Sequence, residues 1–140
     1  MENQLKDKIV QWALEQFESL GYTLKNSQSE NILDTPWSYL LKFETSQGYI
    51  YLKHTPDMFA IESKVIKILD EQFDASVVEI IACDTELNCF LMKDAGITLR
   101  ELLKQSFDEA LLFRAIEQVT ALQDAISEHV DVFLDIGVPD

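Results

Sequence analysis

The sequence is poor in the residues that mark several large protein classes. Its 140 residues include only two cysteines, three prolines and four glycines. This composition excludes a disulfide-rich secreted scaffold, a collagen-like repeat and a Pro/Gly-rich disordered chain. No apolar run approaches the roughly 20 residues of a membrane-spanning helix, and the charged start MENQLKDKIV lacks the apolar segment of a signal peptide. We therefore expect a cytoplasmic protein.

Basic residues are also scarce. Eleven Lys and Arg stand against 25 Asp and Glu, which gives a formal net charge of -14. A field of this sign repels nucleic acid phosphates and anionic lipid headgroups, so we expect neither nucleic acid nor a membrane as a partner. It would favour a cationic substrate, but a solvated acidic surface that maintains solubility is the simpler explanation. Because 47% of the residues are hydrophobic, the chain can bury a core.

The two cysteines give no evidence of a metal site. Cys83 and Cys89 flank the polar segment DTELN, which is typical of a turn between two strands. A cross-strand disulfide would fit such a turn, but two partly buried thiols in a reducing compartment fit the sequence better. Neither His54 nor His129 lies at a zinc-ligand spacing from them, so no metal site is predicted.

Hydrophobic periodicity in the first part of the chain predicts a helix followed by a β-hairpin. Apolar residues recur at helical spacing over 4–20, and Gly21 follows as a C-terminal cap. The polar stretch 27–37 indicates an irregular strand and a loop. Residues 39–44 and 49–54 alternate as two strands around the tight turn SQG.

A second helix and a second hairpin follow. Thr55 is predicted to be the N-cap and Pro56 the first helical residue of a helix ending near Phe73. Its buried stripe would contain Ile61, Val65, Ile68 and Leu69. The β-rich runs VVEIIAC and NCFLM, joined by the DTELN turn, predict two further strands.

The composition changes from strand-rich to helix-rich at Asp94-Ala95-Gly96. Beyond this point the strings TLRE (98–101) and SFDE (106–109) are capping boxes, each of which predicts a helix start. The second of these helices should be long, with an apolar stripe from Leu112 to Val130. The pattern predicts an α+β chain, with an antiparallel sheet and one packed helix over 1–94 and a helical part over 95–140.

Lys53 is the first candidate functional residue. It ends an apolar and aromatic strand and shares a face with Tyr49 and Tyr51. An unpaired ammonium there would be costly, and Glu62, near the start of the next helix, is the candidate partner. A strand lysine paired with a helix glutamate is how protein kinases hold the α- and β-phosphates of ATP. A surface lysine and a helix-flank glutamate that make no contact would explain the spacing equally well.

The sequence around these residues resembles that of a known protein family. The strings PWSYLLKFETSQGYIYLKHTP, IESKVIKIL and CFLMKDAGITLREL are similar, in this order, to aminoglycoside phosphotransferases and related phosphotransferase enzymes. In those families a strand ending in Leu-Lys precedes a helix with a Glu and a hinge of the form Leu-Met-x-Asp-Ala-Gly. The tail LQDAISEHVDVFLDIGVPD is similar to the start of the family's second lobe, so the resemblance runs from about Thr35 onward. It implies a protein-kinase-like N-lobe over 1–94 and the hinge and first C-lobe helices over 95–140.

The resemblance implies a nucleotide site on the N-lobe. Lys53 would contact the α- and β-phosphates of ATP or GTP, and Glu62 would hold Lys53 in place. Met92 would lie at the back of the adenine pocket. The carbonyl of Lys93 and the amide of Ala95 would bond the adenine edge.

The phosphate-covering turn would be Thr35-Pro36-Trp37-Ser38, which has no glycine-rich loop; the aminoglycoside kinases share this departure from the protein-kinase pattern. Ser38 and Trp37 are candidate phosphate contacts within it. Packing of Trp37 against the sheet edge is an equally good interpretation.

The resemblance implies transfer of the γ-phosphate from a Mg²⁺-bound nucleotide to a hydroxyl of a small molecule. The family's His-x-Asp loop with a downstream Asn and a further Asp has no counterpart, because HTPD at His54 and HVD at His129 lack that Asn. We therefore expect a truncated N-terminal portion that has no catalytic residues of its own. Exposed apolar faces on its last helices would favour self-association. Two alternatives stay open: an acidic α+β interaction module with a purely structural Lys53–Glu62 pair, and a pseudokinase-like regulator.

Overall fold

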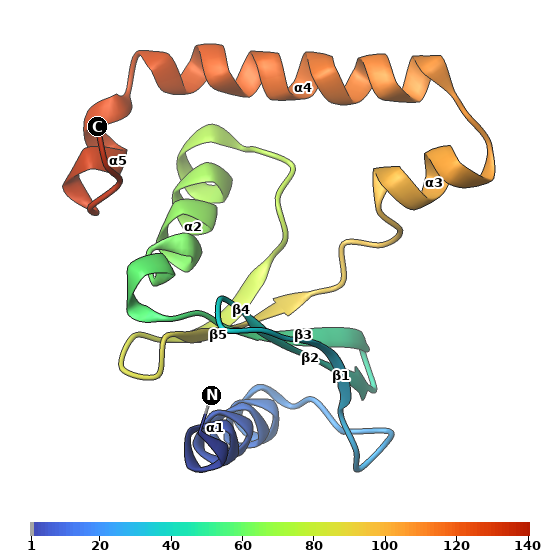
Figure 1. Cartoon of the computed structure of the whole chain (residues 1–140), viewed down its shortest axis with the longest axis vertical. Helices are drawn as coiled ribbons and strands as arrows, with labels where there is room; N and C mark the ends of the chain where they lie inside the picture. Colours follow the sequence, from blue (N-terminus) through green and yellow to red (C-terminus); the bar gives the residue numbers. More distant parts are fainter. Residues whose placement is uncertain (1) are drawn as a thin grey trace. The chain divides into compact units, whose positions relative to one another are not determined.

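The computed structural model describes residues 2–140 and confirms the α+β class (Figure 1). Its five strands form one antiparallel sheet in the order β1-β2-β3-β5-β4. The strands are β1 (Glu30–Asp34), β2 (Tyr39–Thr45), β3 (Gly48–His54), β4 (Ile80–Asp84) and β5 (Cys89–Lys93). The helices are α1 (Asn3–Leu20), the 3-10 turn η1 (Asp57–Phe59), α2 (Glu62–Phe73), α3 (Leu99–Gln105), α4 (Glu109–Ser127) and α5 (Val130–Asp135).

The chain divides into two compact units. The first, here called the sheet unit, contains the residues up to Ser63 together with Val78–Asp94. The second, the helical unit, contains Lys64–Val77 and Ala95–Asp140. One boundary between the units therefore lies between Asp94 and Ala95, where the sequence becomes helix-rich. Most of α2 belongs to the helical unit. No helix among the described residues has the length and apolar character needed to cross a membrane.

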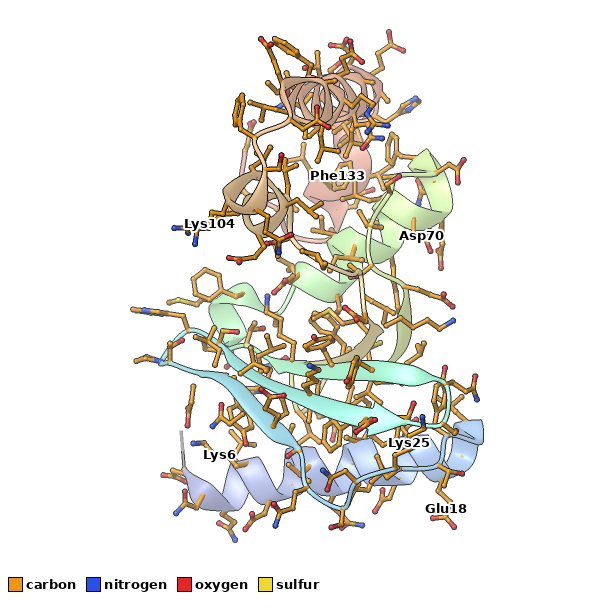
Figure 2. All side chains as sticks on the ribbon, turned by 90° about the vertical axis from the view of Figure 1, so that its right-hand side faces the viewer. Lys6, Glu18, Lys25, Asp70, Lys104 and Phe133 are labelled. Carbon is orange, nitrogen blue, oxygen red and sulfur yellow. The ribbon has the colours of Figure 1, made fainter. Side chains whose placement is uncertain are left out.

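In the sheet unit, α1 covers one face of the sheet (Figures 1 and 2). Its buried side chains Ile9, Ala13 and Phe17 follow one another at i, i+4 and i+8, so they form a single stripe. The Phe17 ring meets Phe43 of β2 edge-on, with ring centroids 5.2 Å apart. The sheet residues of this core are Tyr39, Leu41, Phe43, Ile50, Leu52, Cys89 and Leu91. The predicted cap is confirmed, because Gly21 is left-handed (φ 79°) and follows the last helical turn directly.

The two inner strand pairs, β2–β3 and β3–β5, keep a continuous register, as the predicted hairpin alternation requires. The two outer pairs do not. The β1–β2 register shifts between Asn31 and Leu33, and the β4–β5 register shifts between Ile80 and Ala82. Both edge strands of the sheet are therefore irregular.

The predicted start of the second helix is wrong. Thr55 is buried, its N–H donates to the Asn88 carbonyl at 3.1 Å, and its hydroxyl donates to the Phe59 carbonyl at 3.3 Å. The bond to Asn88 holds Thr55 at the end of the sheet, and its hydroxyl donates to a carbonyl where an N-cap would accept a helical N–H, so Thr55 caps no helix. Pro56 precedes only the 3-10 turn η1, and the α-helix begins at Glu62. The predicted stripe residues Ile61, Val65, Ile68 and Leu69 are half-buried.

One of the two helix starts predicted from the capping-box strings is confirmed. Thr98 caps α3 by accepting the Glu101 N–H at 3.2 Å. Ser106 is not the N-cap of α4, because its own N–H closes the last turn of α3 on the Leu102 carbonyl. Asp108 is the N-cap instead and accepts the Leu111 N–H at 3.2 Å.

The helical unit buries few side chains. Phe133 of α5 is its buried residue and stacks on Phe73 of α2 with ring centroids 5.8 Å apart; Phe133 is labelled in Figure 2. The long helix α4 ends at Ser127, so Val130 belongs to α5 and not to the predicted continuous stripe. On α4 the apolar residues Phe113, Ile116 and Val119 are all more than half exposed.

Candidate functional site

Lys53 and Glu62 form an ion pair on the face of the sheet that α1 does not cover. Lys53 lies near the end of β3, and Glu62 is the first residue of α2. Their Nζ and Oε1 atoms are 2.6 Å apart. The side chains are only 24% and 35% exposed, so each partly desolvated charge has the opposite charge beside it. The predicted contact is therefore confirmed, and the interpretation without contact is wrong.

The strand register shows what surrounds this pair. Lys53 lies opposite Leu40 of β2 on one side and Phe90 of β5 on the other. Tyr51, two residues before Lys53, lies opposite Met92. Because side chains alternate between the faces of a sheet, these five residues share the face that α1 does not cover. The ammonium of Lys53 thus stands at one end of an apolar and aromatic surface.

The predicted hinge residues lie in different places. Met92 is on the Lys53 face, as described above. Lys93 is its neighbour in β5, so the Lys93 side chain is on the opposite face, where Nζ pairs with Glu79 Oε2 at 2.9 Å. This hydrogen bond raises the pKa of Lys93. Ala95 is exposed and begins the helical unit, so the geometry described for the sheet unit does not include it.

The turn that contains Ser38 closes on itself. The Thr35 hydroxyl oxygen accepts the N–H groups of Trp37 at 3.3 Å and Ser38 at 3.1 Å. The Thr35 N–H donates to the Ser38 carbonyl at 3.0 Å. Since these two amides are already bonded within the turn, in this conformation they form no cradle for an anion. Ser38 could contact a phosphate only through its hydroxyl.

An aromatic contact ties this turn to the segment between Lys53 and Glu62. The Trp37 ring meets the Phe59 ring of η1 edge-on, with centroids 6.3 Å apart. Both rings remain exposed, by 62% and 45%. The Trp37 ring therefore contacts η1, an interaction that the sequence did not predict. The sequence signal for it was the apolar pair Met58-Phe59 in an otherwise polar stretch.

Sequence reasoning also missed a set of hydrogen bonds between the segment that joins Lys53 to Glu62 and the turn between β4 and β5. We call residues 54–61, between Lys53 and Glu62, the connector. The amide Nδ2 of Asn88 donates to Asp57 Oδ1 at 2.5 Å, and the Asn88 carbonyl accepts the Thr55 N–H. His54 Nδ1 donates to the Leu87 carbonyl at 2.8 Å. The β4–β5 turn therefore holds the connector.

Cys89 is the titratable group of the sheet unit whose pKa folding shifts most clearly. Its side chain is 2% exposed. Burial, followed by the nearby charge of Asp84 and by Cys83, raises the pKa of Cys89 to about 12. The structure forms no disulfide between the two cysteines. In residues 2–140 no group of three or more His, Cys, Asp or Glu side chains is placed to hold a metal ion.

No protein-family model matches the sequence, and no curated protein matches it at a significant level. The resemblance to phosphotransferases therefore rests on the strings quoted above. What the geometry adds is the paired lysine and glutamate on an apolar sheet face.

Proposed function

We propose that this chain is the nucleotide-binding portion of an ATP- or GTP-dependent small-molecule kinase. The observation that carries the proposal is the 2.6 Å ion pair between Lys53 on a strand and Glu62 on the following helix. Such a pair keeps an ammonium extended over a sheet face, where it can donate to the α- and β-phosphates of a nucleotide. Removal of either partner would leave a partly buried charge without its counter-ion.

The surface next to Lys53 suits the base of the nucleotide. Tyr51 of β3 and Met92 of β5 lie opposite each other on this face and are half-buried, whereas Phe90 is only 3% exposed and does not offer its ring to a ligand. Apolar and aromatic side chains of this kind bind a planar ring, while a few polar groups fix its orientation. In our proposal these polar groups are the backbone carbonyl of Lys93 and the backbone amide of Ala95, and the Ser38 hydroxyl contacts a phosphate.

The negative net charge of the chain affects how a nucleotide can bind to it. A nucleoside triphosphate is an anion, and it approaches a protein with a formal net charge of -14. Mg²⁺ carried by the phosphates reduces the repulsion, and salt screens it over about 8 Å at physiological ionic strength. We therefore expect binding that depends on Mg²⁺ and does not weaken steeply with added salt.

The chemical step belongs to the complete kinase. Phosphoryl transfer needs a carboxylate that orients the attacking hydroxyl and further groups that hold Mg²⁺. The sequence contains no His-x-Asp string followed by the required Asn. In our proposal this chain binds nucleotide, and the γ-phosphate passes to a small-molecule hydroxyl only in the intact enzyme, by positioning and charge stabilisation.

Calorimetric titration of the chain with MgATP tests the proposal. Lys53→Met removes the ammonium and keeps most of the side-chain volume. Loss of charge-assisted bonds to phosphate should weaken binding about 10- to 100-fold. Glu62→Gln should weaken it less, because the Lys53 ammonium is still present although its charged partner is lost. Lys6→Met is the matched control, since Lys6 lies on α1, the helix that covers the opposite face, and pairs with the Asp34 carboxylate; its side chain is 22% exposed against 24% for Lys53.

Two outcomes would contradict the proposal. One is an absence of MgATP binding by the unsubstituted chain at millimolar nucleotide. The other is equal binding by the Lys53→Met and Lys6→Met variants. Either result would favour the acidic interaction module, in which Lys53 and Glu62 contribute only a structural ion pair worth about 0–1 kcal/mol.

A further inference from the structure

The connector is held to the β4–β5 turn at three successive points. His54 Nδ1 donates to the Leu87 carbonyl at 2.8 Å, and the Thr55 N–H donates to the Asn88 carbonyl at 3.1 Å. The Asn88 amide then donates to Asp57 Oδ1 at 2.5 Å. These contacts join residues more than 30 positions apart in sequence, and Lys53 and Glu62 lie immediately before and shortly after them.

Asn88 has two roles in this arrangement. Its backbone is left-handed, with φ 49°, a conformation that asparagine tolerates better than most residues. Its side chain supplies the amide that reaches Asp57. The turn before it is fixed by Asp84, whose Oδ1 accepts the N–H groups of Glu86 and Leu87, both at 2.9 Å. The donor that holds Asp57 therefore projects from an ordered turn.

The connector is short and closed on itself, so a fixed point at Asp57 is transmitted to Glu62. The Phe59 N–H donates to the Pro56 carbonyl, and the Ala60 N–H donates to the Asp57 carbonyl. Glu62 begins α2 two residues later. A slip of one residue at a helix start turns a side chain by about 100° and moves it about 1.5 Å. Such a slip would take the Glu62 carboxylate away from Lys53.

We propose that Asn88 and Asp57 are positioning residues, which set the connector so that the Glu62 carboxylate meets the Lys53 ammonium. Lys53 and Glu62 bond each other, and Asn88 and Asp57 bond each other. Their importance for nucleotide binding rests on the function proposed above, but their control of the ion pair does not. Unlike a general stabilising contact, this role predicts that their loss frees the Lys53 side chain in a folded protein.

Three substitutions test the side-chain contact between Asn88 and Asp57 apart from the left-handed backbone at position 88. Asn88→Gly keeps a residue that accepts a positive φ and removes only the amide. Asp57→Ala removes the acceptor from the other side. Asp57→Asn retains a carbonyl oxygen that can accept the same hydrogen bond, so it should rescue the contact. Asn26→Gly is the matched control, because the Asn26 side chain accepts the Gln28 N–H in an exposed turn elsewhere in the sheet unit.

The first measurement uses the full chain without nucleotide. NMR relaxation of the Lys53 side-chain methylenes reports their order on the ps–ns timescale. We expect this order to fall in Asn88→Gly and Asp57→Ala towards that of the exposed Lys64, and to remain unchanged in Asp57→Asn and Asn26→Gly. The double variant Asn88→Gly/Asp57→Ala should lose no more Lys53 side-chain order than either single variant, because the two single substitutions remove the same contact. A Lys53 that stays ordered in folded Asn88→Gly overturns the proposal.

The second measurement is MgATP titration of the same variants. Asn88→Gly and Asp57→Ala should each bind about tenfold more weakly, the equivalent of one lost hydrogen bond, and Asp57→Asn should bind as the unsubstituted chain does. Equal weakening in Asp57→Asn and Asp57→Ala would overturn the positioning role. Loosening of Lys53 in a chain that binds no nucleotide would instead support the positioning role and refute the nucleotide function.

Discussion

Because the Cys89 thiol is buried, the stability of the sheet unit depends on pH in the alkaline range. Burial raises the pKa of Cys89 from 9.0 to about 12. Between these two values the unfolded chain has lost the thiol proton, whereas the folded chain keeps it. The folded state then binds more protons, so its stability falls as the pH rises from about 9 to about 12.

Cys89→Ala should remove this contribution. We expect the difference in unfolding free energy between the unsubstituted chain and the variant to shrink by up to ~1.4 kcal/mol per pH unit above pH 9. Urea denaturation at half-unit steps of pH measures it, with Cys83→Ala as the control. Parallel stability curves for the unsubstituted chain and Cys89→Ala would show that the thiol titrates alike in both states.

Single residues also show which parts of the site the sequence could predict. The Lys53–Glu62 contact could be proposed from sequence, because its members are nine residues apart on a strand and the next α-helix and an apolar strand face leaves a lysine few other partners. The spacing alone allowed the absence of this contact equally well. The contact between Asn88 and Asp57 spans 31 positions and joins two loops. No local pattern encodes such a pairing, so it emerged only from the folded chain.

Among the secondary-structure elements, α4 provides a direct test of a corrected helix start. Asp108 accepts the Leu111 N–H, whereas Ser106 ends the preceding helix. Asp108→Ala should therefore destabilise the chain by about 1 kcal/mol through loss of an N-cap. Ser106→Ala should change the unfolding free energy by less than about 0.5 kcal/mol. Chemical denaturation of both variants decides between the two positions, and a larger loss in Ser106→Ala would restore the capping box inferred from sequence.

The elements that sequence patterns placed correctly are those with strong internal periodicity. The β2–β3 hairpin follows from strict alternation around SQG, and α1 follows from its apolar stripe and the glycine at position 21. The error at Thr55 has a different origin. A Thr-Pro pair is a good local helix start, but the Thr55 N–H and hydroxyl form bonds to Asn88 and Phe59 instead. The tertiary bond to Asn88, together with the local bond to Phe59, outweighed the helix-start signal of the Thr-Pro pair.

At the scale of the whole molecule, exposed apolar surface and net charge oppose each other. Phe113, Ile116 and Val119 are 54%, 52% and 56% exposed and follow one another along α4. Such surface favours self-association, while a formal charge of -14 on every copy resists it. Salt should therefore promote association, because raising it from about 0.1 M to 1 M shortens the screening length from about 10 Å to 3 Å.

Sedimentation velocity at these two salt concentrations measures the effect. We expect a larger mean sedimentation coefficient at high salt, and its loss in Ile116→Glu. Gln118→Glu adds the same charge to α4 without removing an apolar side chain, so it should associate nearly as the unsubstituted chain does. A monomer at both salt concentrations would contradict the prediction.

The irregular outer strands determine which kind of assembly this would be. A straight, regular edge offers unpaired N–H and carbonyl groups at which a neighbouring chain can add a strand and seed a fibril. Here β1 and β4 each break register against their inner neighbour, at Ile32 and Ile81 respectively. Such breaks bend and twist the edge and so interrupt the template for cross-chain pairing. We therefore expect strand addition at both borders of the sheet to be disfavoured, so that any association should occur through exposed helix surfaces.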